Sequence, residues 1–136
     1  MFGLAEQIRG AHLRIRRVIG DVLAPDGSEI RLAGRVAGAS MVECTLPPGG
    51  VSAAVRHRTV EEVWLVVGGA GEVWRSRDGR QTTLPVGPGS WLTIPVGTHF
   101  QFRTTGRVPL RIVIATTPPW PGADEAVRVE DHWMIV

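Results

Sequence analysis

The side chains that could transfer protons are few in this sequence of 136 residues. The chain contains no lysine and no tyrosine, so arginine supplies all of its permanently basic side chains. Schiff-base catalysis is excluded without lysine, and arginine does not lose its proton in a protein. Acid–base chemistry must therefore use a carboxylate or one of five other side chains, which are His12, His57, His99, His132 and Cys44.

Two stretches of similar plan carry two of these histidines. Residues 47–74 contain a Pro-Gly turn, a short strand, a charged loop that starts with His57 and ends with two glutamates, an apolar strand and a glycine-rich turn. Residues 87–103 repeat a glycine turn, an apolar strand, a Pro-x-Gly turn, a histidine (His99) and a strand. Two hairpin-like units of this kind predict a small β-barrel with a polar site inside it.

The remaining sequence also predicts short strands separated by glycine and proline turns, which favours an all-β fold. Strands are expected at 12–23, 30–36, 40–46, 63–67, 72–77, 81–84, 90–94, 99–104 and 110–115. Residues 2–9 favour a short amphipathic helix. The tail, 116–136, is rich in proline and contains Trp120 and Trp133. We expect it to form an extended arm that packs over the barrel or onto a second subunit, because exposed tryptophans are costly in water.

Length and composition restrict the classes of function. A chain of this length predicts one domain over 1–136. The net charge is +2 and no dense basic patch is evident, so nucleic acid is not an expected partner. No run approaches the roughly 18 apolar residues of a membrane span. Cys44 is the single cysteine and cannot form a disulfide within the chain, which is consistent with a reducing compartment and predicts a cytoplasmic protein.

The two histidine-bearing stretches resemble the two motifs of the cupin superfamily. The first motif is Gly, five residues, His-x-His, three or four residues, Glu, six residues and Gly; the second is Gly, five residues, Pro-x-Gly, two residues, His, three residues and Asn. Glu62 and Gly69 have the spacing of the first motif, and Gly89 and the Pro-x-Gly turn at 95–97 have that of the second. The resemblance covers residues 40–115 and implies a double-stranded β-helix, or jelly-roll, barrel with the tail as a C-terminal arm.

In metal-binding members of this superfamily, three histidines and the glutamate point into the barrel. Counted with four residues before the glutamate, His57 and Glu62 match two of these positions, and Val55 replaces the first histidine. Counted with three, arginines take both histidine positions. His99 comes one residue earlier than the last histidine of the motif. The resemblance implies His57, Glu62 and His99 as ligands of iron, manganese, nickel or zinc. Because one histidine is missing, the ion is either held weakly or absent.

The strand at 99–104 has two possible orientations, which the sequence leaves open. If His99 points inward, so do Gln101 and Arg103, which could bind an anionic or carbonyl group of a substrate. If Phe100 and Phe102 point inward, His99 lies outside and this part of the barrel is apolar.

Three functions follow from these alternatives. The leading hypothesis is a metal-dependent cupin acting on a small organic substrate, of dioxygenase, isomerase, lyase or cyclase type, with Trp64 as a wall of the cavity. The second is a metal-free cupin that binds a small molecule between Phe100, Phe102 and Trp64. The third is a scaffold protein with a fully packed interior. We expect a homodimer, because the apolar arm offers a contact surface. No residue is assigned as catalytic.

Other candidates have simpler interpretations. His12 and His132 are isolated near the termini and are expected at the surface. Glu43 and Cys44 face opposite sides of one predicted strand, and we favour Glu43 outside with Cys44 as a buried thiol, because unpaired acidic residues are rarely buried. Glu61 is expected to be solvated, and Trp74 is expected in the core or at an interface.

Overall fold

The computed structural model describes residues 22–23 and 26–135. Among these residues the chain forms eleven β-strands and one short 3-10 helix. They are β1 (Val22–Leu23), β2 (Glu29–Arg35), β3 (Ser40–Leu46), β4 (Val55–His57), β5 (Glu61–Gly68), β6 (Gly71–Arg77), β7 (Arg80–Val86), β8 (Trp91–Ile94), β9 (His99–Thr104), β10 (Leu110–Thr117), η1 (Ala123–Glu125) and β11 (Ala126–Arg128). The predicted all-β class is confirmed. The helix expected at 2–9 lies outside the described residues, as do His12 and most of the strand expected at 12–23.

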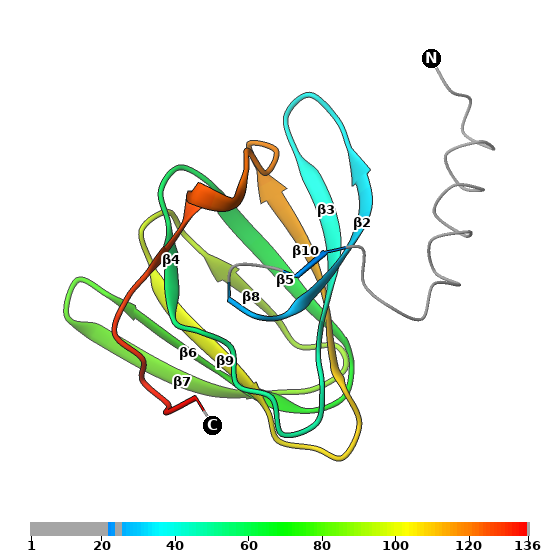
Figure 1. The fold of residues 1–136 in the computed structure, drawn as a ribbon, viewed down its shortest axis with the longest axis vertical. Coiled ribbons are helices and arrows are strands. Elements are labelled where there is room, and N and C mark those ends of the chain that lie inside the picture. Colours follow the sequence, from blue (N-terminus) through cyan, green and yellow to red (C-terminus); the bar gives the residue numbers. More distant parts are fainter. Residues whose placement is uncertain (1–21, 24–25, 136) are drawn as a thin grey trace.

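The strands form two antiparallel sheets that face each other as a flattened barrel (Figure 1). The first sheet has the order β1-β2-β3-β10-β5-β8, and the second has the order β11-β4-β9-β6-β7. From β3 to β10 the chain passes repeatedly from one sheet to the other, which is the jelly-roll arrangement of a double-stranded β-helix. In the part of the chain that the structure describes, no helix is long and apolar enough to span a membrane.

Alternation along the strands builds the core between the sheets. On β5, Trp64 and Val66 are buried, while the alternating residues Val63, Leu65 and Val67 are exposed. β10 pairs with β5 and presents Ile112 and Ile114 to the same side. From the other sheet, Phe102 of β9 meets Trp64 edge-on, with ring centroids 5.2 Å apart. Every second side chain of a strand lies on one face, so these strands bury one face of each sheet.

A glycine turn joins β5 to β6 where the first motif predicts one. Gly69 has a φ of +75°, a conformation that side chains other than glycine rarely adopt. A Cβ atom at this position would also collide with the carbonyl oxygen of Pro109. Both the backbone conformation and the close approach of the chain therefore require glycine here.

The C-terminal arm packs on its own barrel. After β10 it passes Trp120, forms η1, and pairs β11 with β4 at the edge of the second sheet. It then continues across the outer face of that sheet toward the C-terminus (Figure 1). Both arm tryptophans therefore contact the barrel of the same chain, Trp120 at the cavity and Trp133 at the outer face.

Candidate functional site

A cavity of about 750 Å³ lies between the two sheets. Its wall is mostly apolar, and Trp64, Phe100 and Phe102 provide the aromatic part. The polar lining comes from separate parts of the fold: β4, β5, β10, and the residues before and within β2 and β3. These polar and ionisable lining residues are Asp26, Ser28, Arg35, Ser40, Cys44, His57, Glu62 and Thr116.

His57 is the last residue of β4, and its side chain is buried at the cavity. The ring lies edge-on to Phe100 and to Trp120, with centroids 5.2 Å and 5.1 Å away. Its Nδ1 atom has no hydrogen-bond partner among the described residues. Burial lowers the pKa of His57 to about 4, and the nearby Glu125 carboxylate only partly opposes this. The imidazole is therefore neutral at physiological pH.

Glu62 projects into the cavity from β5, next to His57. Its Oε1 accepts a hydrogen bond from Trp64 Nε1 at 3.0 Å, and its Oε2 accepts one from Thr116 Oγ1 at 2.8 Å. These bonds fix both oxygens and favour the carboxylate form. Burial outweighs them and raises the pKa of Glu62 to about 7. At neutral pH the protonated and ionised forms of Glu62 are therefore both well populated.

The side chains of His57 and Glu62 form a close pair in which burial favours the neutral form of both groups. His57 Nδ1 lies 3.9 Å from Glu62 Oε1. An exposed pair of this type would be ionised as imidazolium and carboxylate near pH 5.5, between their ordinary pKa values. In this cavity, burial favours the neutral form of each. The pair can thus present an acid (protonated Glu62) beside a base (neutral His57), which is an arrangement that active sites use for acid–base catalysis.

A second polar group lies at the cavity wall around Asp26. Its Oδ1 accepts hydrogen bonds from the backbone N–H and the hydroxyl of Ser28, at 3.0 Å and 2.6 Å. Burial raises the pKa of Asp26 and also that of the Cys44 thiol, which is not reactive in this state. Cys44 is buried and Glu43 lies on the outer face, bonded to Arg111 at 2.7 Å. This is the favoured sequence alternative.

His99 does not join the pair, and its prediction as a metal ligand that converges with His57 and Glu62 is wrong. Phe100 is the buried residue at the cavity, while His99 lines a shallow polar depression on the other side, next to the hairpin between β6 and β7. The reason is strand parity. Because His99 comes one residue early after the Pro-x-Gly turn, it occupies the face opposite to that of Phe100.

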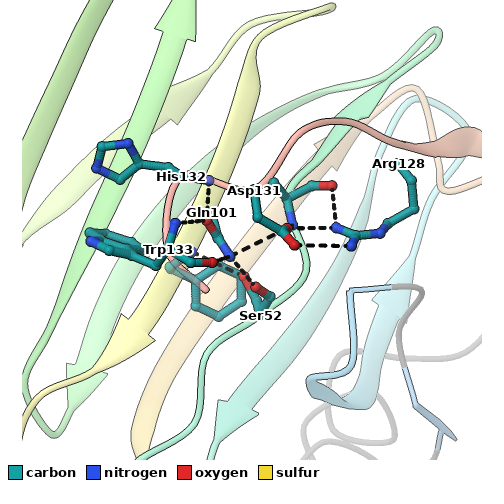
Figure 2. Close-up of polar contacts among 8 residues, drawn as sticks. Ser52, Gln101, Arg128, Asp131, His132 and Trp133 are labelled. Atoms are coloured by element: carbon teal, nitrogen blue, oxygen red, sulfur yellow. Dashed lines mark hydrogen bonds and ion pairs between the residues drawn. The ribbon is translucent and has the colours of Figure 1, made fainter. Parts of the chain in front are cut away.

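Gln101 and Arg103 share this outer face and do not line the cavity, so the predicted substrate contacts are corrected too. Gln101 instead holds the arm (Figure 2). Its amide nitrogen donates to the carbonyl oxygens of Ser52 and Trp133, and its oxygen accepts from the backbone N–H groups of His132 and Trp133. Arg103 pairs with Glu72 at 2.6 Å and lies 4.4 Å from the centre of the Trp133 ring.

His132 of the arm contacts Trp74 of β6. Their rings are stacked, with centroids 4.9 Å apart and an angle of 3° between the planes. His132 is exposed, as expected from the sequence. Trp74 is buried by this contact rather than by the barrel core, because it lies on the same outer face as Gln101.

Glu125 fastens the arm at the mouth of the cavity. Its carboxylate accepts hydrogen bonds from the backbone N–H groups of Thr59 and Val60 and from the Thr59 hydroxyl. Burial opposes ionisation, but these bonds lower the pKa of Glu125 below its ordinary value. The loop after β4 is thereby tied to η1, and Trp120, five residues earlier, is held against His57.

The donor set at the cavity does not fit the metal centre that the motif resemblance implies. Among the described residues, no three side chains of histidine, cysteine, aspartate or glutamate are grouped to hold a metal ion. Phe100 takes the position that a third ligand needs. Glu62 has both oxygens engaged by Trp64 and Thr116. This leaves His57 and an already hydrogen-bonded Glu62 without a third ligand, whereas a catalytic metal site commonly has three protein ligands.

Several lining residues were not found from the sequence. Thr116 continues the alternation of Ile112 and Ile114 on β10, and extending the predicted strand by one residue would have placed it in the cavity. Asp26 lies in a turn, and Trp120 lies in the proline-rich tail. Neither position has a periodic pattern that predicts the direction of its side chain.

Comparison with known proteins places this geometry in a family. The model of the cupin domain matches residues 42–116. A mannose-1-phosphate guanylyltransferase of Klebsiella pneumoniae is 27% identical over 89 residues, and the xanthan biosynthesis protein XanB of Xanthomonas campestris is 29% identical over 89 residues. Each match covers 65% of this chain but only 18% of the relative.

Solved structures show the same fold. A Bacillus halodurans protein superposes with a TM-score of 0.65 at 19% identity, covering 89% of this chain and 83% of that one. The Streptomyces nucleoside dehydratase Pac13 gives 0.61 at 17%, covering 76% and 79%. KdgF from Halomonas sp. gives 0.56 at 20%, covering 68% and 81%. The matched family model spans more than half of this chain and includes the strands that enclose the cavity, and the protein therefore belongs to the cupin family.

Proposed function

We propose that this cupin binds a small, uncharged and largely apolar organic molecule in its cavity, and that His57 and Glu62 act on the polar group of that molecule by proton transfer. The observation that carries the proposal is the pair itself: two ionisable side chains, 3.9 Å apart, in an otherwise mostly apolar wall. A volume of about 750 Å³ is in the range of ordinary ligand sites.

The charges around the cavity favour an uncharged ligand. Asp26 and Glu62 both line it, and burial raises the pKa of each. A bound carboxylate or phosphate would add a negative charge next to these groups and would have to lose its hydration. Arg35 is the only arginine in the lining, and it is exposed at the end of β2. An anionic ligand therefore has no buried positive partner in the described wall.

The pair also supports a reaction. Neutral His57 can accept a proton from a carbon or oxygen of the substrate, while protonated Glu62 donates one to a second oxygen. In a dehydration, the C–H proton moves to His57, the C–O bond breaks, and the hydroxyl leaves as water with the Glu62 proton. The C–H electrons form the new double bond. The resulting imidazolium and carboxylate then return to the neutral pair by one proton transfer. The neighbour Pac13 is a nucleoside dehydratase, a reaction of this class.

The test uses two probes with the same aromatic ring system, 2-naphthol, which is uncharged, and 2-naphthoate, which is an anion. We expect 2-naphthol to raise the melting temperature and 2-naphthoate to have little effect. His57→Ala and Glu62→Gln should weaken the stabilisation by 2-naphthol, and His99→Ala, on the outer face, should not. Preferential stabilisation by 2-naphthoate would contradict the proposal, as would an effect of 2-naphthol that survives in both cavity variants.

A metal held by His57 and Glu62 alone is the alternative mechanism. Repeating the 2-naphthol titration with a chelator, and with added Zn²⁺ or Mn²⁺, distinguishes this metal mechanism from proton transfer by the pair alone. If 2-naphthol binds only when the ion is present, metal assistance would replace proton transfer as the mechanism.

We also propose a cytoplasmic location, which the single, buried and unpaired thiol of Cys44 supports.

A further inference from the structure

The hydroxyl groups of the cavity wall have hydrogen-bond partners within the protein. Ser28 and Thr116 donate to the carboxylates of Asp26 and Glu62, at 2.6 Å and 2.8 Å. The Ser40 hydroxyl accepts a backbone N–H of the arm at 3.0 Å. In the described part of the wall, unused hydrogen-bonding capacity remains at two places. One is the imidazole of the proposed acid–base pair, and the other is a carboxylate oxygen in the turn before β2.

This second place is Asp26. Its Oδ1 accepts both hydrogen bonds from Ser28, and its Oδ2 accepts none from a described residue. The turn before β2 accounts for Oδ1 alone, because an aspartate closes such a turn with one side-chain oxygen. The carboxylate also lines the cavity, and burial raises its pKa. A hydrogen-bond donor at Oδ2 would therefore compensate a group that the protein itself satisfies only in part.

Asp26 and the pair of His57 and Glu62 belong to different parts of the wall. The backbone carbonyl of Asp26 accepts from the N–H of Ala53 at 2.7 Å, which holds the turn against the loop before β4. In the first sheet, β3 and β10 separate β2 from β5, which carries Glu62. Adjacent strands lie about 4.8 Å apart, so β2 and β5 are roughly 14 Å apart. A ligand whose first polar group meets the pair therefore needs a second polar group, farther along its skeleton, to reach Asp26.

We propose that Asp26 accepts a hydrogen bond from a second hydroxyl group of the ligand, and that the ligand is a diol with its hydroxyls at opposite ends of an apolar skeleton. This inference rests on the proposed function, because the first hydroxyl is the group bound at His57 and Glu62. A hydroxyl donates to the carboxylate without adding a charge to the cavity. An ammonium group would also donate, but its desolvation in a mostly apolar wall costs far more.

Calorimetric titration of the wild type with related naphthols provides the first test. 2-Naphthol has one hydroxyl and tests the proposed function alone. The far-ring isomers, 2,6- and 2,7-dihydroxynaphthalene, add a hydroxyl on the other ring, whereas 2,3-dihydroxynaphthalene adds one beside the first. At least one far-ring isomer should bind about five- to tenfold more tightly than 2-naphthol, as expected for one hydrogen bond to a carboxylate. The 2,3-isomer should not show this gain.

Variants of Asp26 test whether its carboxylate provides the gain. Asp26→Ala should abolish the advantage of the far-ring isomer over 2-naphthol, and a cooperative melting transition checks that the variant is folded. Asp26→Asn keeps an oxygen for Ser28 and presents an N–H group to the cavity. It should shift the preference from 2,6-dihydroxynaphthalene toward 6-methoxy-2-naphthol, because an ether oxygen only accepts. Asp78→Asn is the control in an exposed turn outside the cavity, and it should change neither preference.

Two results would overturn the inference. The first is that neither far-ring isomer binds the wild type more tightly than 2-naphthol does. The second is that the gain survives in Asp26→Ala or, if that variant does not fold, that Asp26→Asn keeps the preference of the wild type. Binding of 2-naphthol without a gain from the second hydroxyl would remove this inference and leave the proposed function in place. If none of the naphthols binds, both are wrong.

Discussion

Replacement of Glu62 by glutamine should leave the free energy of unfolding unchanged or slightly lower at acidic pH, and should raise it at basic pH. The folded pKa of about 7 lies above the ordinary value of 4.5. The folded state therefore holds the Glu62 proton more tightly than the unfolded state does. The stability that this contributes is complete below pH 4.5 and is lost as the pH rises through 7. Each unit of pKa difference corresponds to about 1.4 kcal/mol, so the wild type should lose about 3 kcal/mol through this group by pH 9.

Glu62→Gln has no proton to lose and keeps much of the local geometry. Its amide oxygen can still accept from Trp64, and its amide nitrogen can donate to Thr116 if that hydroxyl turns. We expect the variant to equal the wild type, or to be slightly less stable, at pH 5. At pH 9 it should be more stable by about 2–3 kcal/mol.

The assay is urea unfolding followed by tryptophan fluorescence at pH 5, 7 and 9. Glu130→Gln is the control, because Glu130 is exposed on the arm, and it should shift the unfolding free energy little and equally at each pH. The same stability difference between Glu62→Gln and the wild type at pH 5 and pH 9 would refute the reasoning. It would mean that Glu62 is ionised in the folded cavity throughout this range.

Three further changes test other parts of the structure. Burial lowers the pKa of His57 from 6.5 to about 4, so the stability that neutral His57 contributes is complete above pH 6.5 and is lost as the pH falls through 4. Acidification should therefore cost the wild type about 3 kcal/mol of unfolding free energy through this group. Urea unfolding should show that His57→Phe does not have this loss. Gln101→Leu removes five hydrogen bonds to Ser52 and the arm, one of them long at 3.5 Å, and should lower the unfolding free energy by about 2–4 kcal/mol. It should also increase acrylamide quenching of tryptophan fluorescence, while Thr82→Leu at an exposed position should have a small effect. Phe100→His puts a second imidazole beside His57, and calorimetry should show Zn²⁺ binding at least about tenfold tighter than in the wild type, whereas His99→Ala should not change it.

Most of the fold follows from local patterns in the sequence. Strands expected at 40–46 and 99–104 have these bounds in the structure. The glycines and prolines mark the turns because positive φ and a fixed φ restrict which residues fit there. Alternation on β5 also indicates that Glu62 and Trp64 share a face, and both line the cavity.

The candidate site was only partly predictable, because one residue of register decides the face of a side chain. Counting along the second motif puts Phe100 at the position of the last histidine, and the metal-ligand hypothesis needs His99 to point inward despite being one residue early. In the structure Phe100 is the residue at the cavity, and this one-residue difference puts the His99 imidazole on the outer face. The plain alternation of Phe100 and Phe102 with polar residues gives the observed orientation. The position of Trp120 depends on contacts with residues more than sixty positions away, such as His57, and no local pattern contains that information.

The cost of keeping His57 and Glu62 inside the cavity indicates that stability does not explain the pair. Burial opposes the charged form of each group, and their pKa values move in opposite directions from those of a stabilising ion pair. A buried polar pair of this kind is often replaced by apolar side chains without loss of stability. The adjacent Phe100 shows that this wall can accommodate an apolar ring. A ligand that hydrogen-bonds neutral His57 and protonated Glu62 would compensate both desolvated groups at once. Of the pair, His57 Nδ1 is the buried atom that has no hydrogen-bond partner among the described residues, and we infer that a polar group of the ligand would be recognised there.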